Sequence, residues 1–299
     1  MDLEELAVLT LRWLSGCELR SGGGRPLPDV FVLQSSQPTP LAATLYEPVA
    51  CLILQGAKEV LLGDAVYHLG RGDILVVSHD IPVNSRITTA RPGEPYLAIV
   101  LSLDVGLLRS LYDEAGRAAG DVDVERRGTP ALASTAADPR LVDAIARYLA
   151  LVEDEVAAKV LASAIRREIH FRLLMAPSGG MLRNLLRHDS HASMVAMAIS
   201  RIREGYRETI AVPELAREVG MSASSLHKHF RAITSTTPLQ FQKDLRLLEA
   251  RRLLMAGQHA VSDVAYEVGY ESPNQFSREY SRKYGVPPSV DLRTSVAAG

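Results

Sequence analysis

The sequence predicts an α+β protein with two domains: an antiparallel β-barrel with flanking helices in residues 1–180, and an all-α domain in residues 181–299. Short β-branched runs between turn signals fill residues 30–103, whereas apolar residues recur at helical spacing afterwards. The segment 177–180 (PSGG) separates the two blocks, and a length of 299 residues suits two domains of about 150 residues.

The first fifteen residues predict a short amphipathic helix. Its apolar positions are Leu3, Leu6, Leu9 and Trp13. We expect Trp13 to pack in the core rather than stack on a ligand. The glycine run 22–24, followed by two prolines, predicts a flexible connection after the helix.

Many short strands are predicted between residues 30 and 103. The apolar runs lie at 30–33, 50–54, 59–62, 74–77 and 97–103. The turn signals between them are Gln55-Gly56, Gly63-Asp64, residues 70–73, Pro82 and Pro92-Gly93. This spacing is typical of an antiparallel sandwich or barrel. A barrel of about eight strands can enclose one small ligand, or its interior can be filled by side chains, and the sequence leaves both open.

Helical spacing returns after residue 104 and predicts helices at 105–116, from Pro139 onward, and at about 156–175. One face of the second helix comprises Leu141, Ile145, Tyr148, Leu149 and Val152, and the third helix carries Val160, Leu161, Ile165, Ile169 and Leu173. Either the two long helices cap the barrel, or their remaining apolar surface forms a homodimer. The sequence supports both interpretations equally.

The last hundred residues contain an internal repeat. Residues 214–220 (ELAREVG) recur as 263–269 (DVAYEVG), a displacement of 49 residues. After a one-residue insertion, the positions that match at a displacement of 50 are Ser222, Leu226, Phe230 and Pro238 with Ser272, Phe276, Tyr280 and Pro288. Each copy predicts a helix, a tight turn and a second helix. The repeat therefore predicts two helix-turn-helix motifs, at about 212–233 and 261–284.

Glycine and serine mark the same two points of each copy. Gly220 and Gly269 supply the positive φ at the end of the first helix, and Ser222 and Ser272 are good N-caps for the second. Residues 239–255 predict a long helix that joins the motifs. We expect Phe241, Leu245, Leu248 and Leu254 to face the motifs, and Lys243, Arg246, Arg251 and Arg252 to remain outside. One rigid helix can match the ~34 Å repeat of successive major grooves.

The net charge of −2 is unevenly distributed along the chain. From Leu186 onward there are 15 Lys and Arg against 12 Asp and Glu, a net of +3. The first 185 residues carry 18 against 23, a net of −5. A mildly basic C-terminal part is a weak indication of nucleic-acid binding, and an uneven surface without a function is the alternative.

The second copy resembles the signature of the arabinose-regulator (AraC/XylS) family of bacterial transcription factors. Residues 265–280 (AYEVGYESPNQFSREY) and 283–288 (KYGVPP) carry the resemblance, which covers about 190–292. Residues 30–105 resemble the N-terminal effector domain of one branch, through 55–58 (QGAK), 71–78 (RGDILVVS) and Pro82. This second resemblance implies a cupin-like barrel.

The resemblance implies a sequence-specific DNA-binding transcriptional regulator. It supports an activator, although it also allows repression, and an activator would contact RNA polymerase. A small-molecule effector in the barrel would change the arrangement of the DNA-binding domains within a homodimer. The alternatives are a cupin-type metalloenzyme fused to a DNA-binding module, and a constitutive regulator whose barrel only dimerises.

The resemblance also assigns the DNA-reading residues. The recognition helices are 223–231 and 273–283, with the outward residues Ser224, Ser225, His227 and Lys228 in the first and Asn274, Gln275, Ser277 and Arg278 in the second. Arginine can read guanine, and Asn or Gln can read adenine. Arg231, Arg282 and Lys283 flank the helix ends and suit phosphate. For each residue the alternative is a solvated surface side chain.

Neither a metal nor a cofactor nor an enzymatic activity is expected. The strand region offers only His68 and His79, eleven residues apart, which is an incomplete ligand set. Cys51 lies in an apolar run and is either a core hydrophobe or a reactive thiol that senses an effector. The second role requires a lowered pKa, for which Lys58 and Arg71 are the candidate cations.

The cysteine count and the N-terminus predict a cytoplasmic protein. Cys17 and Cys51 are too few for a disulfide framework. The first five residues, MDLEE, are acidic where a secretory signal would be basic. No apolar run approaches the ~18–20 residues of a membrane-spanning helix, so no membrane partner is expected.

Overall fold

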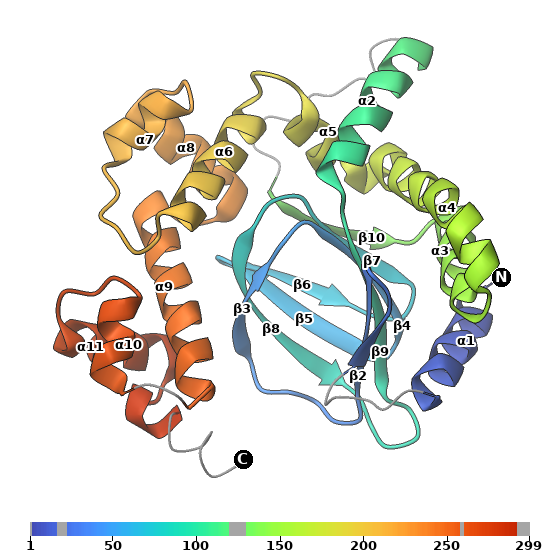
Figure 1. Cartoon of the computed structure of the whole chain (residues 1–299), viewed down its shortest axis with the longest axis horizontal. Coiled ribbons are helices and arrows are strands. Elements are labelled where there is room, and N and C mark those ends of the chain that lie inside the picture. The colour runs from blue at the N-terminus through green and yellow to red at the C-terminus, as the bar shows by residue number, and fades with distance from the viewer. Residues whose placement is uncertain (1, 17–22, 120–129, 258–259, 292–299) are drawn as a thin grey trace. The chain divides into compact units, whose positions relative to one another are not determined.

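The computed structural model describes residues 2–16, 23–119, 130–257 and 260–291 (Figure 1). The chain separates into two compact units, residues 1–193 with 232–235 and residues 194–231 with 236–299. The main boundary between the two compact units therefore lies between residues 193 and 194, whereas the Pro- and Gly-containing segment in the sequence lies at 177–180. The domain boundary after Gly180 stays a prediction.

Two antiparallel sheets form the centre of the first unit (Figure 1). The six-stranded sheet has the order β1 (Gly23–Leu27), β2 (Val30–Ser35), β9 (Tyr96–Ser102), β4 (Val49–Gln55), β7 (Asp73–Val77) and β10 (Leu132–Ala136). The four-stranded sheet has the order β3 (Ala42–Tyr46), β8 (Ile81–Thr89), β5 (Ala57–Leu62) and β6 (Ala65–Leu69). The predicted antiparallel β-fold is confirmed, although hydrogen bonds between the described strands do not close it into one continuous barrel.

The central strands of the larger sheet are buried on both faces. On β4, Ala50, Leu52 and Leu54 belong to the core shared with the helices. Because successive side chains of a strand point to opposite faces, Cys51 and Ile53 face the other way, toward the four-stranded sheet. This second face makes the barrel interior.

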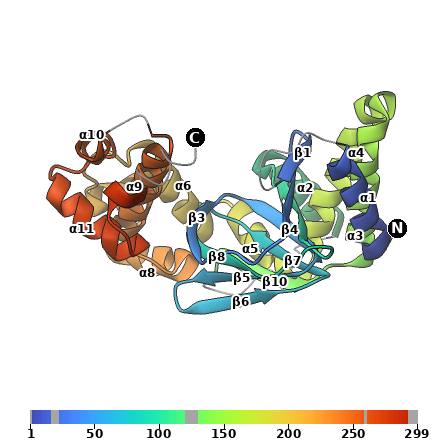
Figure 2. The same cartoon turned by 90° about the horizontal axis from the view of Figure 1, so that it is seen from below.

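Helices cover the outer face of the six-stranded sheet (Figure 2). They are α1 (Leu3–Ser15), α2 (Val105–Ala119), α3 (Pro139–Ala150), α4 (Glu155–Met175) and α5 (Gly180–Leu186), with short 3₁₀ turns at Leu151–Glu153 and Pro177–Gly179. Three of them begin at aspartate caps, Asp2, Asp138 and Asp154, whose carboxylates accept backbone N–H groups of the first turn. Trp13 packs against the shared core, as expected.

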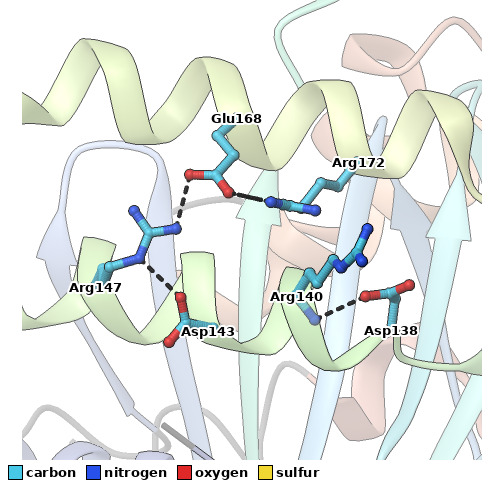
Figure 3. Close-up of polar contacts among 6 residues, drawn as sticks. All are labelled: Asp138, Arg140, Asp143, Arg147, Glu168 and Arg172. Carbon is cyan, nitrogen blue, oxygen red and sulfur yellow. Dashed lines mark hydrogen bonds and ion pairs between the residues drawn. The ribbon is translucent and has the colours of Figure 1, made fainter.

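An ion-pair network fixes α4 on α3 (Figure 3). Arg147 of α3 donates to Asp143 at 2.9 Å and to Glu168 of α4 at 2.7 Å, and Arg172 donates to Glu168 at 2.8 Å. The hydrogen bonds from Arg147 and Arg172 lower the pKa of Glu168. Since these side chains are partly exposed, the network orients α4 more than it stabilises the fold.

Helix α4 buries only some of the apolar residues that were singled out in the sequence. Ile165, Ile169 and Leu173 are buried, whereas Val160 and Leu161 are exposed. Val160 remains 67% exposed. The two long helices thus cover the sheet and still leave an apolar surface on α4.

Two further predictions for the first unit are wrong. Residues 23 and 24 lie in strand β1 rather than in a flexible connection, while residue 22 lies outside the described ranges. Pro82 is the second residue of β8 rather than a turn. Pro82 lies opposite Leu45 of β3, whereas the pairing of β8 with β5 ends at Asn84. On the β5 side no described strand is paired at this point, so the N–H that proline lacks is not needed there.

The second unit is helical throughout its described part. Its helices are α6 (His191–Glu204), α7 (Val212–Glu218), α8 (Ala223–Thr234), α9 (Pro238–Met255), α10 (Val261–Glu267) and α11 (Pro273–Tyr284), although α6 begins and α8 ends in residues assigned to the first unit. Helix α9 buries side chains on nearly every side, which makes it the core helix of the unit. No helix in the described ranges is long and apolar enough to cross a bilayer.

Candidate nucleic-acid interface

The two helix-turn-helix motifs close their turns in the same way. Gly220 has φ +76° and Gly269 has φ +90°, so the predicted left-handed glycines are confirmed. The N–H of Met221 donates to Ala216 O at 2.8 Å, and that of Tyr270 donates to Ala265 O at 2.9 Å. The bond is repeated 49 residues later, as in the sequence repeat.

Serine caps begin both recognition helices. Ser222 Oγ accepts from the N–H of Ser225 at 3.2 Å, and Ser272 Oγ accepts from that of Gln275 at 3.4 Å. Both predicted caps are confirmed. In the second copy Pro273 follows the cap, where its missing N–H costs no helical hydrogen bond.

Aromatic side chains fill the core of each motif. Phe230 of α8 meets Phe241 of α9 edge to face, with ring centroids 5.5 Å apart. In the second motif Phe276 contacts Tyr270 and Tyr280, with centroids 5.3 and 5.5 Å apart. The repeated inward positions therefore attach both recognition helices to the same central framework.

The basic residues of α9 do not form an outward surface, which corrects the prediction. Lys243 pairs with Glu279 at 3.0 Å, Arg251 pairs with Asp291 at 3.2 Å, and Arg246 donates to Tyr206 O at 2.7 Å. Only Arg252 stays largely exposed, paired with Glu249 of its own helix. Three of the four cations thus bind the surrounding helices and loops.

Helix α11 presents a polar face. Asn274, Arg278 and Arg282 are exposed at i, i+4 and i+8, beside the exposed Gln275. Arg278 makes no hydrogen bond or ion pair within the described ranges. Its guanidinium is therefore available to a partner.

The remaining two predicted residues of α11 are less accessible. Ser277 and Lys283 are half-buried. Lys283 Nζ is bound to Asp244 of α9, so a phosphate would have to compete with that carboxylate. This contact could not be predicted from local sequence patterns, because the two residues are 39 positions apart.

Helix α8 presents the corresponding face of the first motif. Its exposed residues are Ser224, His227, Lys228 and Arg231, whereas Ser225 is half-buried. The displacement of 50 places Lys228 where the second copy has Arg278. Each recognition helix therefore carries one cation at the equivalent position.

The barrel interior holds Cys51, the predicted sensing residue. Burial raises the pKa of this thiol, and the nearby Lys58 offsets the effect only in part. Arg71 is exposed and lies beside Glu4 at 3.8 Å. The lowered pKa that a reactive thiol requires is therefore not found.

The two histidines of the strand region lie in different environments. His68 is exposed, 3.2 Å from Glu59, whereas His79 is buried and burial lowers its pKa to about 4. Among the described residues, no group of three or more His, Cys, Asp or Glu side chains is placed to hold a metal ion.

Comparison with known proteins gives relatives for both parts of the chain. Residues 26–181 match the family described as AraC-type transcriptional regulator N-terminus, and residues 215–294 match a helix-turn-helix domain. The virulence regulon transcriptional activator VirF of Yersinia enterocolitica is 22% identical over 246 residues, 82% of this chain and 89% of that protein. The transcriptional activator RhaS of Escherichia coli is 26% identical over 151 residues, 50% of this chain and 53% of that protein.

Solved structures of ToxT from Vibrio cholerae share the fold. One has a TM-score of 0.52 at 11% identity and covers 88% of this chain and 97% of ToxT. Another, with a bound unsaturated fatty acid, has a TM-score of 0.50 at 12% identity and covers 92% and 96%. With the match of the N-terminal family over more than half of its length and a helix-turn-helix domain behind it, the chain belongs to the AraC-type transcriptional regulators.

Proposed function

We propose that this chain is an effector-controlled transcriptional activator that binds promoter DNA through both helix-turn-helix motifs. The observation that carries the proposal is the pair of capped recognition helices with Lys228 and Arg278 at equivalent exposed positions. The relatives VirF and RhaS are named transcriptional activators, which supports the direction of control and a contact with RNA polymerase. We place its action in the cytoplasm, where the promoters are, and assign it no catalysis.

Sequence reading is assigned mainly to the second motif. Arg278 suits the O6 and N7 of guanine, while Asn274 and Gln275 suit adenine. The residues of the first motif that face the duplex are Ser224, Ser225, His227 and Lys228. Except for the lysine their side chains are shorter, so this motif reads less of the base sequence. Arg231, Arg282 and Lys283 bind phosphate and fix the register of the protein on DNA.

The barrel is assigned the effector site. A fatty acid is bound in one ToxT structure, and the fold shared with ToxT supports a small-molecule site in this chain too. Control requires that the effector bind two arrangements of the protein with different affinities. Cys51 belongs to the interior that would contact the effector.

Homodimerisation is assigned to the exposed face of α4. Val156, Val160, Leu161, Phe171 and Met175 are large apolar side chains that this helix leaves in solvent. Exposed large apolar side chains gathered on one helix favour a protein–protein contact. A dimer would bring four helix-turn-helix motifs to one operator.

The test is selection of bound fragments from random and genomic DNA at fixed salt, because phosphate contacts make affinity steeply salt-dependent. The proteins are wild type, Arg278→Ala, and the control Arg252→Ala, which removes an exposed arginine outside the recognition helices. We expect paired sites with wild type and control, and a loss of ~1–3 kcal/mol at one base in Arg278→Ala. Identical enrichment in all three would remove Arg278 from the readers. No enrichment with wild type would mean either that an obligatory effector is missing or that the motifs do not read DNA, and repeating the selection with residues 181–299 alone separates the two.

A further inference from the structure

A lysine is buried in the barrel interior. Lys58 lies on β5, and only 7% of it is exposed. Its Nζ donates to the Tyr46 hydroxyl at 2.7 Å and lies 5.2 Å from the centre of the same ring. No carboxylate pairs with it within the described ranges. Because lysine is almost never fully buried unless it is paired, Lys58 needs an explanation beyond packing.

The polar groups around Lys58 have more donors than acceptors. An ammonium has three N–H donors, and the contact with Tyr46 uses one of them. Tyr96 of β9 is fully buried, and apart from the neighbouring Cys51 thiol its hydroxyl has no hydrogen-bond partner in the described part of the chain. The Cys51 thiol lies near both Lys58 and Tyr96, which places these groups in one cluster. Buried donors without a partner require an explanation, and an acceptor supplied by a bound molecule would satisfy them.

The surroundings of the cluster are aliphatic. Val60 and Leu62 share the inward face of β5 with Lys58, and Ile53 shares that of β4 with Cys51. One ammonium neutralises one negative charge, whereas a phosphate dianion would leave a charge unpaired in apolar surroundings. The arrangement thus fits a single carboxylate attached to an apolar body.

We propose that Lys58, with Tyr46 and Tyr96, binds the carboxylate of a monoanionic, otherwise apolar small molecule in the barrel. The ammonium and the Tyr96 hydroxyl donate to the carboxylate oxygens, and the aliphatic side chains contact the body of the molecule. This inference rests on the proposed effector control, because it names the chemical class of the effector. Cys51 is then a neighbour of the ligand rather than a nucleophile.

The experiment compares acids with their amides on the full chain. Butanoate, hexanoate, octanoate and benzoate are titrated by calorimetry against wild type, each beside its primary amide, which has the same shape without the charge. The variants are Lys58→Met, which keeps an unbranched side chain as far as Cε and removes the ammonium, Tyr96→Phe, which removes the hydroxyl, and the control Lys159→Met at an exposed lysine of α4.

We expect the acids to bind wild type and Lys159→Met at least about tenfold more tightly than the amides, since hydrogen bonds to charged groups are the stronger ones. Lys58→Met should bind acid and amide equally, and Tyr96→Phe should reduce the preference several-fold. Equal binding of acid and amide by wild type, an unchanged preference in Lys58→Met, or no binding of any acid overturns the carboxylate site. If Lys58→Met does not fold, wild type and Tyr96→Phe still decide.

A DNA arm separates this inference from the proposed function. The affinity for a selected promoter fragment is measured with and without the acid that binds best. Acids that bind through Lys58 without changing DNA affinity leave the carboxylate site standing and contradict effector control by it. Promoter binding without any acid binding contradicts the carboxylate site and leaves the DNA-binding regulator intact.

Discussion

Replacing each of the two turn glycines by alanine should have very different costs. Both residues have positive φ, so each alanine carries the left-handed strain of ~1–2 kcal/mol. At Gly220 an added Cβ meets nothing within 4 Å. At Gly269 it would lie 2.2 Å from the carbonyl oxygen of Arg207, a backbone atom that cannot rotate away.

We therefore expect Gly220→Ala to lower the free energy of unfolding only by the left-handed strain. Gly269→Ala should lower it by at least ~2 kcal/mol more, because the turn must separate from the loop before α7. Native-state hydrogen exchange of peptides from 212–234 and 260–284, followed against urea, measures the two motifs separately. The Gly220→Ala variant serves as the matched control for strain. Equal losses at the two positions would refute the steric argument.

Three further predictions concern the cap, the dimer and pH. Ser272→Ala should lower the stability of α11 by ~1 kcal/mol in the same exchange experiment, and an unchanged stability would show that the Ser272 cap does not stabilise the helix. Val160→Glu should convert a dimer to a monomer in analytical ultracentrifugation, whereas Val66→Glu, at a valine of β6 that is 49% exposed, should not. The pKa of His79 is about 4 in the folded state and 6.5 as a model value, so the unfolded chain binds more protons between these values and stability falls as pH drops through 6.5 toward 4. Between pH 7 and pH 5 the free energy of unfolding of wild type should therefore fall by about 2 kcal/mol more than that of His79→Gln. Urea unfolding followed by the fluorescence of Trp13, the one tryptophan, measures both proteins, and equal decreases would contradict this account.

The helix-turn-helix motifs could be predicted almost completely from the sequence. Their determinants are local. Gly269 ends the first helix of the second motif, Ser272 caps the next helix three residues later, and Phe276 and Tyr280 supply its inward positions. The repeat states this logic twice, which removes the ambiguity of a single copy. The confirmed turns and caps follow from these short-range rules.

The strands were predicted less completely, because some contain few β-branched residues. The segments Gly23–Leu27 and Leu132–Ala136 are edge strands with glycine, proline, serine or alanine. The first pairs with the strand that follows it directly, whereas the second relies on β7, far away in the sequence. Pro82 was interpreted as a turn, but a proline is tolerated in β8 because the pairing with β5 has already ended at that point. This depends on which strands pair, and the sequence around Pro82 does not reveal it.

Charged residues were the hardest to place. Lys243 and Arg251 look like solvated helix residues until Glu279 and Asp291 are brought against them by tertiary packing. Lys58 looks like a surface lysine next to Glu59, and either could face outward in an alternating strand. The alternation with Val60 and Leu62 places Lys58 on their face of the strand, but its burial follows from the stacking of the two sheets, which the sequence of β5 alone does not show.

The contacts of α9 limit how this regulator can evolve. The helix meets Phe230 of the first motif through Phe241 and binds Glu279 and Lys283 of the second through Lys243 and Asp244. A change at an outward position such as Arg278 alters the base that is read and leaves this framework intact. A change in the distance between the two half-sites would require α9 and its ion pairs to change together. Operators of descendant proteins should therefore diverge in base sequence long before they diverge in spacing.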